Sequence, residues 1–295
     1  MTLATIGFAG LGNMGEPMVR RLAAAGYSVL AYDVSAPARD RLAGTARVTV
    51  TSTLAEIAKN TDVVILMLPD SGVVEQVLLE DGLLDRIAPP ALVVDMSSSE
   101  PARTRALAER AAQAGITLID APVSGGVVGA RAGSLTIMTG GPAEALETLR
   151  PLLGVLGSKV VHAGSAPGSG HAVKALNNLM SAAHLLASSE AILAGQAFGL
   201  DPAVVVDIVN GSSGRSGSTE TKWPRYILPA TFDSGFSMRL MVKDMKIALQ
   251  LAEAAGVPAS LSHAAVDTWS RATDQMPPGA DHTEIARWLQ QHQDA

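Results

Sequence analysis

The sequence predicts an α/β protein in which a doubly wound sheet domain is followed by an all-α domain that begins with a long central helix. From residue 3 to about residue 161, short β-branched runs alternate with Ala- and Leu-rich segments of helical period, which is typical of βαβ units on a parallel sheet. After Gly164 this alternation stops, and no proline occurs between Pro167 and Pro202. We therefore expect one domain over residues 1–164 and a second over residues 165–295.

The individual elements follow from local composition. The expected strands are rich in Val, Ile and Leu, and they cover residues 4–9, 28–32, 62–68, 92–96, 117–120 and 135–139. The expected helices between them are bounded by Pro, Ser or Gly, and they cover residues 14–25, 72–79, 101–114 and 142–153.

In the second half, residues 171–198 are apolar on nearly all sides, so this segment is expected to be a buried central helix. Further helices are expected at 202–209, 240–255, 261–272 and 283–292, with a Gly/Ser-rich connection at 210–217.

Composition excludes several classes of function. The chain has 295 residues, of which 47% are hydrophobic and 17% charged, as in a compact globular protein. Its net charge of -6 provides no basis for nucleic-acid binding. The lack of cysteine excludes thiolate metal sites, and the six histidines are scattered, so no metal is expected. The lack of cysteine leaves the compartment open, and a cytoplasmic location is the favoured expectation. The N-terminus does not resemble a secretory signal, and Lys174 and Glu190 interrupt the most apolar helix, so no membrane association is expected.

A glycine-rich turn lies between the first expected strand and the first expected helix. It comprises Gly10, Leu11, Gly12, Asn13, Met14 and Gly15. Gly10 suits a tight turn, Gly12 lets a pyrophosphate approach the backbone, and Gly15 allows the helix to pack closely on the strand. Phosphates would bind at the N-terminus of the helix, where free N–H groups favour anions. The alternative interpretation is a glycine-rich turn without a ligand.

Asp33 follows the second expected strand, at the position of a ribose-binding acid. A carboxylate there accepts hydrogen bonds from ribose hydroxyls and repels a 2′-phosphate, so NAD is expected as cofactor in preference to NADP. No arginine directly follows Asp33, and Arg39 comes six positions later. Alternatively, Asp33 only caps the next turn.

Two other strand ends are expected to line the cofactor, because ligands of open α/β sheets lie outside the carboxyl ends of the strands. The residues concerned are Leu68 and Pro69 after one strand and Ser98 after the next. Ser97 and Ser98 are equally compatible with capping the helix that starts at Pro101.

A second glycine-rich segment runs from Asp120 to Gly126. Free N–H groups at Ser124, Gly125 and Gly126 would form a concavity for a substrate carboxylate, and the Ser124 hydroxyl adds a donor. The alternative is a loop that only turns tightly.

The third motif lies at the start of the central helix. Helical spacing places His171, Lys174, Asn178 and Ser181 on one face of an otherwise apolar helix. A lysine in such a place is costly to bury unless it faces a cleft, and a desolvated lysine can act as an acid or base near neutral pH. Lys174 is therefore the expected catalyst, and a solvated helix face is the alternative. His171 is expected to cap the helix or line the cleft.

A fourth motif combines Phe236 with Lys243 and Asp244 at the start of an apolar helix. By itself this pair is equally compatible with an exposed ion pair.

These four motifs, in this order, resemble those of the β-hydroxyacid dehydrogenase family, which includes 3-hydroxyisobutyrate dehydrogenases and tartronate semialdehyde reductases. The resemblance implies a Rossmann domain joined by a long helix to an all-α domain, assembled as homodimers or homotetramers. It also implies that Lys174 is the catalytic lysine, that Asn178 helps to place the substrate, and that Lys243 closes the nicotinamide end of the site. Ser124, Gly125 and Gly126 would hold the substrate carboxylate.

The resulting expectation is an NAD-dependent oxidoreductase that interconverts a small 3-hydroxy carboxylate and its semialdehyde or keto acid, with Lys174 as general acid/base. Imine reductases share the implied fold and the first motif but usually lack the lysine. A Rossmann-type methyltransferase or a non-catalytic dinucleotide-binding module would give Lys174 and Asn178 no role. The segment at 210–223 is expected to influence which substrate is used.

Overall fold

The computed structural model describes residues 5–59 and 61–292. The chain divides into two compact units, Met1–Lys174 and Ala175–Ala295. The division falls within the long helix α8, Ser169–Ala197, so the first turns of this helix belong to the first unit.

The first unit contains a sheet of nine strands in its described residues. The strands are β1 (Thr5–Ala9), β2 (Ser28–Tyr32), β3 (Val48–Val50), β4 (Val63–Leu66), β5 (Ala91–Asp95), β6 (Ile116–Asp120), β7 (Val123–Ser124), β8 (Thr136–Gly140) and β9 (Lys159–Gly164). Their order is β3-β2-β1-β4-β5-β6-β8-β7, and β9 pairs with β8. Successive strands are added first on one side of β1, through β2 and β3, and then on its other side, from β4 to β6. This strand order confirms the expected doubly wound arrangement.

Pairing is parallel from β3 to β6, as expected, whereas β8 runs antiparallel to both β6 and β7. The expected strand at 135–139 therefore exists but does not continue the parallel order. The change follows Asp120, where the segment with β7 and helix α6 (Gly126–Ala132) brings the chain back alongside β6.

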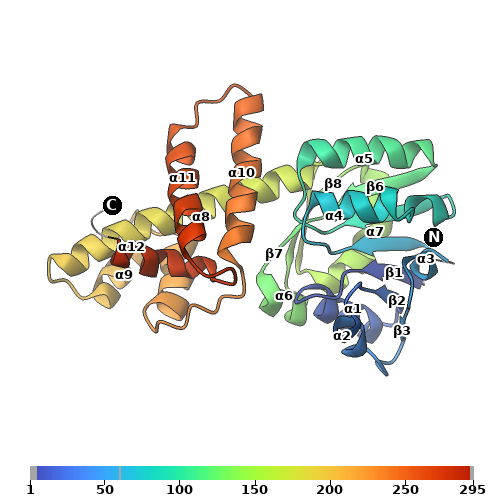
Figure 1. Cartoon of the computed structure of the whole chain (residues 1–295), viewed down its shortest axis with the longest axis horizontal. Coiled ribbons are helices and arrows are strands. Elements are labelled where there is room, and N and C mark those ends of the chain that lie inside the picture. Colours follow the sequence, from blue (N-terminus) through green and yellow to red (C-terminus); the bar gives the residue numbers. More distant parts are fainter. Residues whose placement is uncertain (1–4, 60, 293–295) are drawn as a thin grey trace. The chain divides into compact units, whose positions relative to one another are not determined.

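Helices cover both faces of the sheet (Figure 1). Besides α6 they are α1 (Gly15–Ala24), α2 (Ala36–Asp40), α3 (Leu54–Ile57), α4 (Ser71–Glu75) with the π-helical turn η1 (Gln76–Glu80), η2 (Leu84–Arg86), α5 (Pro101–Gln113) and α7 (Ala143–Leu156). Val63 and Ile65 pack with residues of α1 and α7, whereas Val64 and Leu66 pack with residues of α4 and α5. Alternate residues of a central strand thus serve two separate cores, which is why the strands are nearly continuous hydrophobic runs.

The second unit is helical in its described residues. After α8 come α9 (Pro202–Asn210), the π-helix η3 (Ser218–Ile227), α10 (Met238–Ala254), α11 (Ser260–Gln275), the 3-10 turn η4 (His282–Glu284) and α12 (Ile285–Gln291). Leu185, Met245, Trp269 and Ile285 are fully buried in its core. The five helices expected in this half are confirmed, but η3 was not expected, because its sequence is polar overall and contains Pro224.

The long helix differs from the expectation in one respect. Val173, Leu176 and Met180 are exposed, so α8 is not buried on all sides by this chain. Among the described residues, no helix is sufficiently long and apolar to span a membrane.

Candidate active site

The glycine-rich turn joins β1 to α1, and two of its glycines are explained by packing. A side chain at Gly10 would place its Cβ 2.2 Å from the Met67 carbonyl oxygen, and one at Gly15 would lie 1.8 Å from the Gly10 carbonyl oxygen. At Gly12, by contrast, a Cβ would meet nothing within 4 Å. Gly12 is also absent from the glycines with positive φ. The chain's own structure therefore does not require glycine at this position, whereas close approach of a phosphate to the backbone does.

The first turn of α1 is open to an anion. Met14 occupies the N-cap position and makes no side-chain capping hydrogen bond. The N–H groups at the start of the helix therefore have no side-chain acceptor at the cap, which suits a pyrophosphate.

Asp33 both holds the glycine turn and caps the turn that follows β2. Its Oδ2 accepts the Leu11 N–H at 2.7 Å, and its Oδ1 accepts the Ser35 N–H at 2.8 Å. The capping interpretation of Asp33 is therefore correct. It is compatible with ribose binding as well, because each carboxylate oxygen can accept a second hydrogen bond. Arg39 lies at the same turn, where its Nη1 donates to the Asp33 carbonyl oxygen at 2.5 Å.

Ser97 joins the two strand ends that were expected to line the cofactor. Its Oγ accepts the Leu68 N–H at 2.9 Å, and its own N–H donates to Asp95 Oδ1 at 2.9 Å. The N-cap position of α5 is occupied by Glu100, so neither Ser97 nor Ser98 caps that helix. Ser98 is half-buried beside Ser97, which is fully buried.

The loop at Ser124 needs its two glycines for conformation. Gly125 and Gly126 have φ values of 127° and 60°, which side-chain-bearing residues rarely adopt. Ser124 is half-buried at the end of β7, and both glycines are exposed. The backbone of this loop is therefore accessible to a ligand, as an anion-binding role requires.

The polar face of α8 is buried rather than solvated. Lys174 is 8% exposed, Asn178 6% and His171 1%, although the helix offers exposed positions on other sides. The structure thus does not support the solvated-face alternative. Such burial is costly for an ammonium group and is typical of functional lysines.

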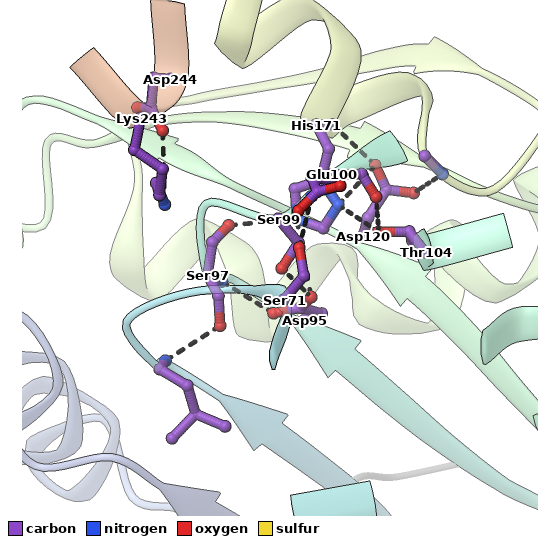
Figure 2. Close-up of polar contacts among 12 residues, drawn as sticks. Ser71, Asp95, Ser97, Ser99, Glu100, Thr104, Asp120, His171, Lys243 and Asp244 are labelled. Atoms are coloured by element: carbon purple, nitrogen blue, oxygen red, sulfur yellow. Dashed lines mark hydrogen bonds and ion pairs between the residues drawn. The ribbon is translucent and has the colours of Figure 1, made fainter. Parts of the chain in front are cut away.

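His171 is fastened within the first unit by its ring and its backbone. The ring nitrogens lie 2.9 Å from Thr104 Oγ1 and 3.1 Å from the Ser97 carbonyl oxygen (Figure 2). Its backbone N–H donates to Asp120 Oδ2 at 2.9 Å. These contacts fit the expectation that His171 supports the site rather than acting as the base. Asp95, Thr104 and Asp120 were not among the expected site residues, although acids at the ends of two neighbouring strands were a visible signal.

In the second unit, Asn178 is paired with the acid of the fourth motif. Its Nδ2 donates to Asp244 Oδ2 at 2.6 Å. Lys243 Nζ lies 3.4 Å from Asp244 Oδ1 (Figure 2). Asp244 is 1% exposed, so an exposed ion pair is excluded for this motif. Sequence spacing did not predict the pairing of Asn178 with Asp244, because 66 residues separate them.

A second lysine, which is half-buried, lies in the segment expected to influence substrate choice. Lys222 of η3 donates from Nζ to Ser181 Oγ at 2.8 Å. Burial lowers the pKa of Lys222 to about 8, although the negative charge of Asp281 acts in the opposite direction and raises it. Burial by itself would raise the pKa of Asp281, but hydrogen bonds from His282, Thr283 and Ser234 hold it well below its ordinary value. Both charged groups are thus held within the all-α unit.

Metal chemistry has no visible site in the part of the chain that the structure describes. No group of three or more His, Cys, Asp or Glu side chains there could hold a metal ion.

Comparisons with known proteins agree with this geometry. Residues 5–164 match the family model described as the NAD binding domain of 6-phosphogluconate dehydrogenase, and residues 168–289 match that described as NAD-binding of NADP-dependent 3-hydroxyisobutyrate dehydrogenase.

Three relatives illustrate the similarity. The 2-(hydroxymethyl)glutarate dehydrogenase of Eubacterium barkeri is 38% identical over 86% of this chain and 84% of its own. The NAD-dependent L-serine dehydrogenase of Pseudomonas aeruginosa is 40% identical over 84% of this chain and 85% of its own. A structure of 3-hydroxyisobutyrate dehydrogenase from Mycobacterium tuberculosis with L-serine has a TM-score of 0.90 at 32% identity, covering 97% of this chain and 99% of that one.

Proposed function

Because this chain belongs to the β-hydroxyacid dehydrogenase family, we propose that it interconverts a small 3-hydroxy carboxylate and its semialdehyde or keto acid with NAD as cofactor. The observation that carries the proposal is the buried polar face of α8. Lys174 and Asn178 lie one helical turn apart on this face, and both are almost inaccessible to solvent. Imine reductases usually lack this lysine, and a non-catalytic module would give neither Lys174 nor Asn178 a role.

The residues around the glycine turn fit a dinucleotide. Gly10 and Gly15 shape the turn, and the unfilled space at Gly12 would admit the pyrophosphate. The other residues that would hold NAD are Leu11, Asn13, Met14, Asp33, Leu68, Pro69, Ser98 and Lys243. When bound, NAD supplies the hydride acceptor for the alcohol carbon. Asp33 supports a preference for NAD, because its carboxylate would repel the 2′-phosphate of NADP.

Lys174 would transfer the proton. In the oxidation, its neutral amine takes the hydroxyl proton of the substrate, and in the reduction its ammonium returns that proton to the carbonyl oxygen. Asn178 would orient the alcohol through its side-chain amide. Ser124, Gly125 and Gly126 would bind the substrate carboxylate through backbone N–H groups and the Ser124 hydroxyl.

The two halves of the chain would have different tasks. We assign cofactor binding chiefly to residues 1–164, and substrate binding and oligomerisation chiefly to residues 165–295. The exceptions are the loop at Ser124, which would bind the substrate carboxylate, and Lys243, which would contact NAD. Met180, Phe198 and Ile208 are large apolar side chains that are 59%, 85% and 62% exposed, which supports assembly as a homodimer or homotetramer. The lack of cysteine supports a cytoplasmic location.

The decisive experiment is a substrate panel. Purified protein would be assayed with 3-hydroxyisobutyrate, L-serine, D-glycerate, threonate, 2-(hydroxymethyl)glutarate and a sulfonated 3-hydroxy acid, each with NAD and with NADP, by absorbance of the reduced nicotinamide. We expect at least one of these acids to reduce NAD, with lower efficiency for NADP. No oxidation of any hydroxy acid, together with reduction of a cyclic imine by NADPH, would show that the proposal is wrong.

A further inference from the structure

A buried carboxylate at the end of β6 attaches the first turn of α8 to the sheet. Asp120, the last residue of β6, is fully buried. Its Oδ1 accepts the Gly168 N–H at 2.7 Å, and its Oδ2 accepts the His171 N–H at 2.9 Å (Figure 2). The N–H groups at the start of a helix have no partner within the helix, and hydrogen bonds to a charged acceptor are strong. Asp120 therefore fixes the start of α8 relative to the end of β6.

Glycines allow this close approach. A Cβ at Gly140 would lie 2.5 Å from Asp120 Oδ1, and one at Gly170 would lie 2.2 Å from the Met138 carbonyl oxygen. Gly168 has a φ of 88°, and its Cβ would lie 2.6 Å from the Pro101 carbonyl oxygen. The glycines before Lys174 are thus explained by the contact of the helix start with β8, α5 and Asp120, without any ligand.

His171 provides a second attachment, because its ring is held between two carboxylates. Its Nε2 lies 3.7 Å from Asp95 Oδ2, and its Nδ1 lies 3.9 Å from Asp120 Oδ2. Asp95 and Asp120 are register partners at the ends of β5 and β6. Asp95 also accepts the Ser99 hydroxyl at 2.8 Å, so it is itself held in place.

Burying this arrangement costs more free energy than a purely structural contact would require. Two carboxylates and an imidazole are each at most 1% exposed, and burial of charged groups costs free energy unless their hydrogen bonds are well formed. An apolar contact would attach a helix to a sheet at lower cost. Hydrogen bonds, unlike apolar contacts, fix both the rotation and the height of the helix.

We propose that Asp120 and His171 are positioning residues that set the rotation of the first turns of α8 and thereby the placement of Lys174. Lys174 follows His171 by three residues and lies on the same helix face. The inference rests on the proposed function, because it assumes that Lys174 transfers the proton. A displacement of about 1 Å at a reacting group can lower the rate by about 100-fold, so a fixed helix start has a direct effect on turnover.

The test uses the full-length enzyme with its best substrate from the panel. The variants are Asp120→Asn and His171→Gln, which keep polar side chains of similar size. The matched control is Asp201→Asn, because Asp201 caps α9 by accepting the Ala203 N–H at 2.8 Å and has no part in the site. We expect both test variants to lower kcat by about 10- to 100-fold with an unchanged KM for NAD, and to shift the pH of half-maximal kcat. The control should leave kcat, the KM for NAD and the pH of half-maximal kcat unchanged.

Rescue by a free amine distinguishes misplacement of the Lys174 amine from a general disruption of the active site. In Lys174→Ala, added ethylamine would take the place of the lysine amine, and it can adjust its position because it is not covalently attached to α8. Asp120→Asn should therefore lower the ethylamine-dependent rate of Lys174→Ala less than about 2-fold, while lowering the rate of the lysine-containing enzyme at least about 10-fold. Equal losses in both backgrounds would overturn the proposal, as would an unchanged kcat or an unshifted pH profile in both test variants.

The outcome distinguishes this inference from the proposed function. Full activity of Lys174→Ala would refute the proposed proton transfer itself. Loss of activity in Lys174→Ala together with unchanged kcat in Asp120→Asn and His171→Gln would refute only the positioning role. A raised KM for the hydroxy acid with an unchanged kcat in Asp120→Asn would assign Asp120 to the Ser124 loop and would also overturn the inference.

Discussion

The side-chain amide of Asn178 donates a 2.6 Å hydrogen bond to the buried carboxylate of Asp244. Asn178 Oδ1 in turn accepts a hydrogen bond from Asn177 Nδ2 at 3.1 Å. The two contacts determine which way the amide of Asn178 faces. A residue that is expected to orient the substrate is therefore itself oriented by an acid on α10.

Replacement of Asp244 by alanine should release this amide. We expect Asp244→Ala to lower kcat/KM for the hydroxy acid by about 10-fold or more, because removing one partner of a buried hydrogen bond costs roughly 1–3 kcal/mol. Steady-state kinetics at saturating NAD would measure the effect. Asp267→Asn, at an exposed acid of α11, serves as control and should leave the kinetics unchanged. A wild-type kcat/KM in Asp244→Ala would contradict the orienting role.

Lys174→Ala should abolish most of the turnover without weakening NAD binding. General acid–base catalysis is worth about 10²- to 10⁴-fold, so kcat is expected to fall by that factor. Titration of protein fluorescence with NAD would show whether the dissociation constant is preserved. Lys246→Ala removes an exposed lysine from α10 and should behave as the wild type. If Lys174→Ala retains more than a tenth of the wild-type kcat, another group transfers the proton.

Asp33→Ser should shift cofactor use toward NADP. The substitution removes the negative charge that would repel a 2′-phosphate, and the guanidinium of Arg39 already lies at the same turn. Because Asp33 Oδ2 also holds the Leu11 N–H, the efficiency with NAD should fall at the same time. The ratio of kcat/KM for the two cofactors measures the shift. Arg39→Ala in the Asp33→Ser background should reverse the gain, and an unchanged ratio in Asp33→Ser would refute the role of Asp33 in selecting NAD.

Lys222 should make the stability of the fold increase with pH above neutrality. Burial lowers its pKa from 10.5 to about 8, so between these two values the folded state binds fewer protons than the unfolded state. The free energy of unfolding therefore rises with pH across that window, and below pH 8 the cost of the partly desolvated charge is fully present. Urea unfolding of the wild type and Lys222→Met at pH 7 and pH 10 would isolate this contribution.

In Lys222→Met the increase with pH should be smaller than in the wild type. Lys246→Met provides the control, because an exposed lysine has no burial cost and should leave the pH dependence unchanged. Identical pH dependence in Lys222→Met and the wild type would show that Lys222 is well solvated.

Much of the fold was predictable because its signals are local. The strand at 28–32 matches β2, and the glycine turn between β1 and α1 has the expected position, since both depend on neighbouring residues and hydrophobic period. Short elements such as β3 and β7 were not predicted, because few residues form them and tertiary contacts stabilise them. The π-helix η3 was missed because its sequence is polar overall and contains Pro224. The antiparallel direction of β8 likewise depends on pairing between distant residues.

For the candidate site, the sequence alone determined which residue types were available and which of them share a helix face. Lys174, Asn178 and the glycines of the first turn were identified in this way, because helical period and turn geometry act over a few residues. The tertiary structure decided their partners. Asp244 beside Asn178 and Asp120 at the start of α8 lie many residues away, and only folding brings such charges into contact where water is excluded.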